Sequence, residues 1–211
     1  MELPFDVKAA EQALSSADPQ MAAVIEAYGP CTMTITPFQS PFESLFKTII
    51  FQQLSTASAN AIFGRVLTLF DGESPTPKTT LGIADEAFRG AGMSKQKIRY
   101  ARDLAEKTIA GTVPEMTALA ALSDQEIIER LSAVHGIGRW TVEMLLMFNM
   151  GRPDILPSTD LVIRKAFQQI YKHEELPKPK AIDAFGERWR PYRSIASWYM
   201  WRVVDGDNDA W

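Results

Sequence analysis

Apolar residues recur at spacings of three and four along most of the chain, which is the pattern of amphipathic helices. Leu45, Ile49 and Ile50, for example, share one face of a segment that begins at Pro41. The strict alternation typical of strands does not persist beyond residues 31–36. The sequence therefore predicts an all-α fold.

Capping residues and prolines predict where these helices begin and end. Asp18-Pro19 begins one helix and Gly29-Pro30 ends it, and Ser123 to Glu126 has the spacing of a capping box. Further helices are expected to begin at Pro41, near Ser55, at Ser94, after Gly138, at or near Asp160 and at Pro191, with a turn-rich linker from Asp71 to Pro77.

The order of these helices predicts two lobes. We expect a central lobe of residues 41–172, with a helix-hairpin-helix over about 127–150, and a second lobe of residues 1–40 with 173–211. A chain of 211 residues with 46% hydrophobic content can bury one core or two small ones that share a cleft.

Composition excludes several classes of protein. No apolar run approaches the roughly 18 residues that span a bilayer, and the start of the chain is not a secretory signal. The single Cys31 excludes an internal disulfide and a four-cysteine iron-sulfur cluster, and with only His135 and His173 a zinc site is not expected. We expect an intracellular monomer without membrane contact, cofactor or catalytic metal.

The net charge of −4 is not that of a typical DNA-binding protein, but charges cluster locally. Basic residues gather in 94–102 and at four C-terminal arginines, whereas acids gather in 85–86, 124–129 and 205–209. Separate basic and acidic faces are one interpretation. The other is that each run is a solvated helix face.

The stretch from Val134 to Thr141 places Gly136 and Gly138 between two expected helices. Such glycines allow a tight turn, and backbone amides at the start of the next helix can bind a phosphate oxygen. A proline-rich break follows, and it ends in Asp160, roughly twenty residues after Gly138. The pattern indicates a DNA-gripping hairpin followed by one carboxylate.

These residues resemble the base-excision DNA glycosylases of the helix-hairpin-helix superfamily, and more narrowly the DNA-3-methyladenine glycosylase II family. The matching motifs are Pro41 to Leu45, Ile49 to Ser55, Gly92 to Ser94 with Lys97, Gly136 to Thr141, Asp160-Leu161 with Arg164-Lys165, and Trp189 to Ser194. The resemblance implies the compact helical form, without the N-terminal β-rich lobe of longer members and with the active site in the cleft between two helical lobes.

The resemblance makes Asp160 the essential carboxylate. Breaking the bond between deoxyribose and a damaged base generates positive charge on the sugar, which a fixed carboxylate stabilises. The alternative is that Asp160 is only a helix N-cap. Relatives that also nick the strand carry a lysine where this chain has Trp140, so lyase activity is not expected.

A flipped base needs an aromatic pocket, and its gap in the duplex needs a plug. The resemblance assigns Trp140, Trp201 and Tyr192 to the pocket, with core packing as the alternative. It assigns the plug to Gln53 or Leu54. The alternative there is that Gln52 caps a helix and Leu54 is core.

The resemblance also assigns phosphate binding, to Gly136, Gly138, Arg139, Thr141 and Lys165. The carbonyls of Val134 and Gly136 are implied as ligands of an optional monovalent cation. His135 replaces the usual proline of the motif, and it either adds a phosphate contact or is merely exposed.

The sequence therefore predicts a monofunctional glycosylase that excises alkylated purines, of the 3-methyladenine or 7-methylguanine type, from double-stranded DNA in base excision repair. One alternative is a glycosylase for a deaminated or oxidised base. Another is a non-catalytic helix-hairpin-helix protein that recognises DNA structure, and a third is an unrelated helical scaffold with a chance Gly-Ile-Gly. The expected location is the nucleoid or cytoplasm, or the nucleus in a eukaryote.

Overall fold

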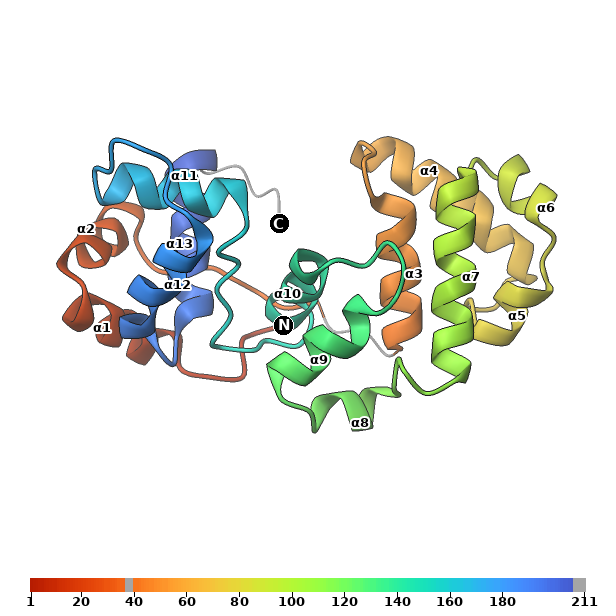
Figure 1. The fold of residues 1–211 in the computed structure, drawn as a ribbon, viewed down its shortest axis with the longest axis horizontal. Helices are drawn as coiled ribbons and strands as arrows, with labels where there is room; N and C mark the ends of the chain where they lie inside the picture. The colour runs from red at the N-terminus through yellow and green to blue at the C-terminus, as the bar shows by residue number, and fades with distance from the viewer. Residues whose placement is uncertain (37–39, 207–211) are drawn as a thin grey trace. The chain divides into compact units, whose positions relative to one another are not determined.

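The computed structural model describes residues 1–36 and 40–206. Those residues form thirteen α-helices and two short 3₁₀ helices and contain no strand, so the predicted all-α fold is confirmed (Figure 1). Residues 31–36 are irregular rather than a strand, although Ile35 donates its N–H to the carbonyl of Met1. The end of the acidic tail, 207–211, lies outside the described residues.

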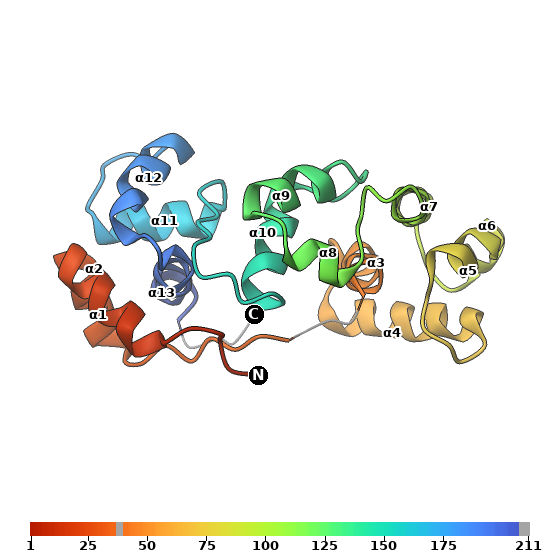
Figure 2. The ribbon, with the colours of Figure 1, turned by 90° about the horizontal axis from the view of Figure 1, so that it is seen from below.

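The chain forms two compact units, and the first comprises residues 1–36 with 143–206. Its helices are α1 (Val7–Ala17), α2 (Pro19–Tyr28), α11 (Leu161–Ile170), α12 (Pro179–Gly186), the 3₁₀ helix η2 (Glu187–Trp189) and α13 (Arg193–Asp205). Figure 2 shows α13 with α1 and α2 on one side and α11 and α12 on the other. The helix α13 is thus the centre of this unit.

A buried carboxylate joins the helices of the first unit. The side chain of Asp18 is fully buried and caps α2 by accepting hydrogen bonds from the N–H groups of Gln20 and Met21. Its other oxygen accepts from the Tyr171 hydroxyl at 2.5 Å and from the Trp189 indole N–H at 2.9 Å. The predicted cap at Asp18 is therefore confirmed, and it also connects distant segments of the unit.

The second unit comprises residues 40–142. It contains α3 (Pro41–Phe51), α4 (Thr56–Leu67), the 3₁₀ helix η1 (Thr68–Phe70), α5 (Pro77–Gly82), α6 (Asp85–Gly90), α7 (Lys95–Ile109), α8 (Met116–Ala120), α9 (Asp124–Ser132) and the start of α10 (Arg139–Phe148). Figures 1 and 2 both show α3 beside α7, and α4 and α5 pack against them. The apolar face predicted from Leu45, Ile49 and Ile50 is fully buried. Each such side chain stabilises the fold by about 1.5–3 kcal/mol.

The division between the units differs from the one expected from the sequence. Residues 143–172 group with the two termini rather than with the central segment, and the boundary falls within α10. The cause is that α11 packs against α13 and α12, and Phe167 of α11 is in ring contact with Phe185 of α12 and Trp189 of η2. Within the described residues, no helix is long and apolar enough to cross a membrane.

Candidate active site and DNA-binding hairpin

Asp160 ends the turn that begins at Pro157 and is the N-cap of α11. Its Oδ1 accepts hydrogen bonds from the backbone N–H groups of Val162 at 2.6 Å and Ile163 at 3.1 Å. The residue is 9% exposed, so its carboxylate is held by the start of the helix and screened from most solvent. Asp160 therefore does cap α11 through its Oδ1, as the capping alternative expected.

The loop before Asp160 is fastened to α13 by two buried serines. The hydroxyl of Ser194 accepts from the Ile155 N–H at 3.0 Å and donates to the Arg152 carbonyl at 2.6 Å. The hydroxyl of Ser197 donates to the Ile155 carbonyl at 3.2 Å. Since both serines are fully buried, these bonds fix the backbone that leads to Asp160.

The four C-terminal arginines contact side chains of their own unit instead of forming a free basic face. Arg190 and Arg193 pair with Asp154 and Glu187, whereas Arg188 and Arg202 lie over the rings of Phe185 and Trp198. The pairing holds the pKa of Glu187 below its usual value, mainly through the hydrogen bond from Arg190. This basic cluster therefore serves the fold of the first unit.

Two aromatic residues expected to contact the base lie in the first unit. Trp201 of α13 is 2% exposed, and its ring centroid is 5.7 Å from that of Phe148. Tyr192, which precedes α13, is half-buried, with its ring 6.1 Å from that of Phe5. Both rings have packing partners, as the core alternative expects.

The hairpin joins α9 to α10 in the second unit, as predicted. Gly136 has a φ of 85°, a conformation that favours glycine, whereas Gly138 does not have a positive φ. A Cβ at Gly138 would meet nothing within 4 Å. Only Gly136 is needed for the turn itself, and Gly138 presents open backbone on an exposed surface.

The residues after the hairpin turn begin α10. Arg139 and Trp140 are exposed, with Trp140 at 38%, and Thr141 is half-buried. The last expected phosphate contact, Lys165, is exposed on α11 of the first unit. The structure thus groups most of the expected phosphate-binding residues at one helix start.

Asp103 supports the hairpin, a role that the sequence did not indicate. Its carboxylate accepts from the His135 backbone N–H at 2.7 Å and lies 3.0 Å from His135 Nδ1 and 2.5 Å from Lys107 Nζ. Burial alone would raise the pKa of Asp103, but the hydrogen bonds from Lys107 and His135 outweigh it and hold the pKa below its usual value. The His135 side chain is 76% exposed.

The turn after α3 carries the two residues expected to fill the gap in the duplex. Gln53 has a φ of 57° and is exposed, and Leu54 is 38% exposed, so Leu54 is not a core residue. Gln52 is the C-cap of α3, as the alternative stated, and its side-chain amide donates to the Gly136 carbonyl at 2.8 Å. The structure therefore brings this turn and the hairpin together.

The two carbonyls implied as cation ligands already accept hydrogen bonds. The Val134 carbonyl accepts from the Ile137 N–H at 3.0 Å, and the Gly136 carbonyl accepts from the Gln52 amide. The positively polarised hydrogens of these donors point at both oxygens and would repel a cation. The pair of carbonyls therefore fits such an ion poorly. The described residues contain no group of three or more His, Cys, Asp and Glu side chains suited to a metal ion.

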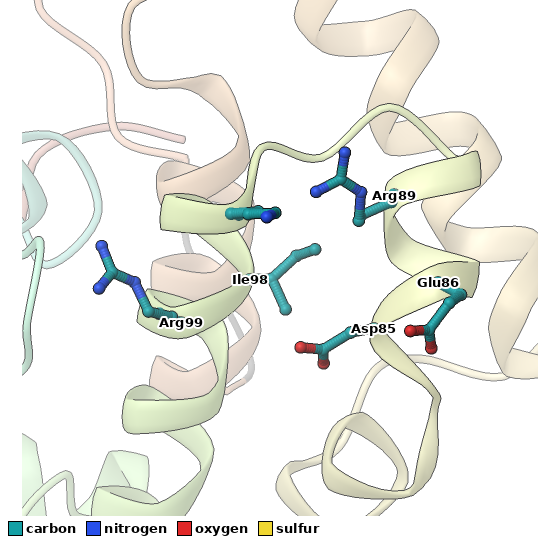
Figure 3. A pocket seen from close by; sticks show the side chains of 6 residues that line it. Asp85, Glu86, Arg89, Ile98 and Arg99 are labelled. Carbon is teal, nitrogen blue, oxygen red and sulfur yellow. The ribbon is translucent and has the colours of Figure 1, made fainter.

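A pocket of about 670 Å³ lies between α6 and α7. Figure 3 shows Asp85, Glu86 and Arg89 on α6, with Ile98 and Arg99 on α7. The lining mixes both signs of charge and includes none of the residues expected in the active site.

Comparisons with known proteins identify the family of the chain. The chain is 32% identical to an alkylbase DNA glycosidase-like protein of Schizosaccharomyces pombe over 96% of both chains, and 38% identical to a DNA-3-methyladenine glycosylase of that yeast over 78% of this chain and 73% of the relative. A crystal structure of a DNA-3-methyladenine glycosidase from Bacillus halodurans matches with a TM-score of 0.84 and 34% identity, over 93% of this chain and 89% of that one. The family model that describes HhH-GPD superfamily base excision DNA repair proteins matches residues 46–191. The chain therefore belongs to the HhH-GPD superfamily.

Proposed function

We propose that this protein is a monofunctional DNA glycosylase that hydrolyses the bond between deoxyribose and an alkylated purine in double-stranded DNA. It leaves an abasic site, and it acts in the cell compartment that holds the DNA. The observation that carries the proposal is Asp160, a screened carboxylate fixed by two backbone N–H groups in a chain that also has the DNA-binding hairpin. The names of its relatives, which include DNA-3-methyladenine glycosylases, support the same reaction.

In this mechanism Asp160 stabilises the positive charge that develops on the deoxyribose as the base departs. A carboxylate of fixed orientation needs little rearrangement in the transition state, and its effect is larger where water is scarce. The same group can position the attacking water. A base such as 3-methyladenine already carries positive charge and leaves readily, so no acid is needed to protonate it.

Trp140 determines how the reaction ends. An indole has no amine with which to form a Schiff base, so water attacks C1′ of the sugar as the base leaves, and the strand stays intact. We assign Trp140, Trp201 and Tyr192 to stacking on the base, because an electron-rich ring attracts a cationic one. Selection by stacking favours alkylated purines over deaminated or oxidised bases, whose recognition requires hydrogen bonds to the base edge.

We assign DNA binding to the hairpin and to the turn after α3. Backbone amides near Gly136 and Gly138, with Arg139, Thr141 and Lys165, hold phosphates. The exposed Gln53 and Leu54 fill the gap left by the flipped nucleotide. A non-glycine residue with positive φ, such as Gln53, is a strained conformation of the kind found at functional sites.

Release of methylated base from alkylated duplex DNA tests the proposal. Wild type should release base and leave strands that break only after alkali, whereas Asp160→Asn should be slower by about 100-fold or more. Asp183→Asn changes an exposed carboxylate of the same unit and should match wild type. Equal release by Asp160→Asn would refute the assignment of Asp160. Binding without release of any base would favour the non-catalytic alternative, and release of only deaminated or oxidised bases would favour another lesion class.

A further inference from the structure

Gln52 connects two parts of the second unit that are 84 residues apart in the sequence. It is the C-cap of α3 and directly precedes the exposed turn of Gln53 and Leu54. Its side-chain amide donates to the Gly136 carbonyl at 2.8 Å, within the hairpin turn. A neutral amide hydrogen bond of this length is well formed.

The backbone of Gln52 is held at the same time by Lys97. The Lys97 ammonium group, in the first turn of α7, donates to the Ile50 carbonyl at 2.6 Å and to the Gln52 carbonyl at 2.7 Å. Carbonyls at the end of a helix lack partners within it, and a cation there is favourable. Burial lowers the pKa of Lys97. The end of α3 is therefore tied to α7 through its backbone and to the hairpin through the Gln52 side chain.

These bonds lie next to a residue whose backbone conformation is strained. Gln53 has a φ of 57°, in the left-handed region that is unfavourable for a non-glycine residue. A strained turn persists only where neighbouring contacts determine its geometry. The bonds of Gln52 and Lys97 are the contacts adjacent to this turn.

We propose that Gln52 is a positioning residue that fixes the Gln53 and Leu54 turn relative to the hairpin, so that one rigid piece both holds the DNA backbone and fills the gap in the duplex. The inference rests on the proposed function. It assigns Gln52 to no contact with the base or the reacting atoms. Its loss should impair nucleotide flipping while the hairpin still binds DNA.

The test compares Gln52→Met with wild type. Methionine has a similar length and no charge but cannot donate to the Gly136 carbonyl. Three quantities are measured: affinity for a duplex that contains an abasic site, the single-turnover rate of base release from methylated duplex, and the fluorescence of 2-aminopurine placed beside the damaged nucleotide. That fluorescence rises when its neighbour leaves the stack.

We expect Gln52→Met to keep its affinity within about threefold, while the release rate and the fluorescence rise both fall by about tenfold, which corresponds to one lost hydrogen bond of about 1.4 kcal/mol. Gln53→Gly, which removes one of the two side chains assigned to the plug, should show the same pattern. Gln12→Met changes an exposed residue of α1 and should behave as wild type. The thermal midpoint of each variant shows whether it is folded.

Unchanged release and fluorescence in a folded Gln52→Met protein would overturn the inference. A parallel fall of affinity and rate would also overturn it, because Gln52 would then serve only to shape the hairpin. If wild type releases no base, the proposed function fails, yet the fluorescence change on binding the methylated duplex, which requires no cleavage, still tests Gln52.

Discussion

The ring of Tyr100 lies directly against the backbone of Gly136. A Cβ at residue 136 would stand 2.2 Å from Tyr100 Cδ2, closer than any such contact in proteins. Tyr100 is half-buried on α7, and its hydroxyl accepts a hydrogen bond from the side-chain amide of Gln96. The Tyr100 side chain therefore covers the hairpin turn at Gly136.

The two hairpin glycines should therefore respond differently to a methyl group. Gly136→Ala combines a clash with Tyr100 and a positive φ, and should lower the free energy of unfolding by about 2–4 kcal/mol. Gly138→Ala meets no protein atom and should change it by less than about 1 kcal/mol, yet weaken duplex binding because the added methyl lies where a phosphate approaches. Denaturant unfolding and fluorescence anisotropy measure the two effects. Equal destabilisation by both substitutions would contradict the structure.

The two roles of Asp160 can be separated by the choice of substitution. Asparagine caps helices about as well as aspartate, so Asp160→Asn should keep wild-type stability, whereas Asp160→Ala should lose about 1 kcal/mol with the cap of α11. Both should lack base release. Thermal unfolding distinguishes them, and a stable Asp160→Ala protein would show that the cap contributes nothing.

The support of the hairpin by Asp103 should make stability depend on pH. Because the pKa of Asp103 is lower in the folded protein, its contribution is present above the unfolded value of about 3.9 and is lost as the pH falls through the folded value. Asp103→Asn should lower the free energy of unfolding by about 1–2 kcal/mol at pH 7, and the difference should shrink below about pH 4. Asp85→Asn, which alters a carboxylate that is 60% exposed, is the control and should have a small effect. A constant difference across the range would contradict the role of the Asp103 charge.

The thiol of Cys31 should be unreactive in the folded protein. Burial raises its pKa to about 12, so at pH 8 it stays in the protonated form, which is a poor nucleophile. Labelling with a thiol reagent at pH 8 should be much slower in buffer than in denaturant, where the pKa returns to about 8.5. Equally fast labelling in both would show that the site is open.

Several long helices could be predicted from the sequence because a capping residue precedes at least two turns of apolar spacing. Ser94 and Ser123 cap α7 and α9 as expected. The short helices α5, α6 and α8 have only five or six residues, too few for a period to be visible. Packing against α7 stabilises α5 and α6, and a contact of this kind is not visible in the local sequence pattern.

The site could be predicted only where it is local in sequence. The hairpin glycines and Asp160 follow from a short motif, but the bond from Asp103 to His135 spans 32 residues and that from Gln52 to Gly136 spans 84. The grouping of residues 143–172 was also beyond the sequence, since it depends on packing between α11 and α13. Long-range contacts of this kind produce no regular residue spacing from which they could be predicted.

The start of α11 has a consequence for how such proteins evolve. One base change converts an aspartate codon to an asparagine codon, and at residue 160 the new side chain would still begin the helix. A duplicated gene could thus lose catalysis in a single step while its product stayed folded and bound to DNA. Among descendants of this chain, selection for the fold alone would retain a capping residue at position 160. Only aspartate at that position would distinguish the enzymes from their inactive copies.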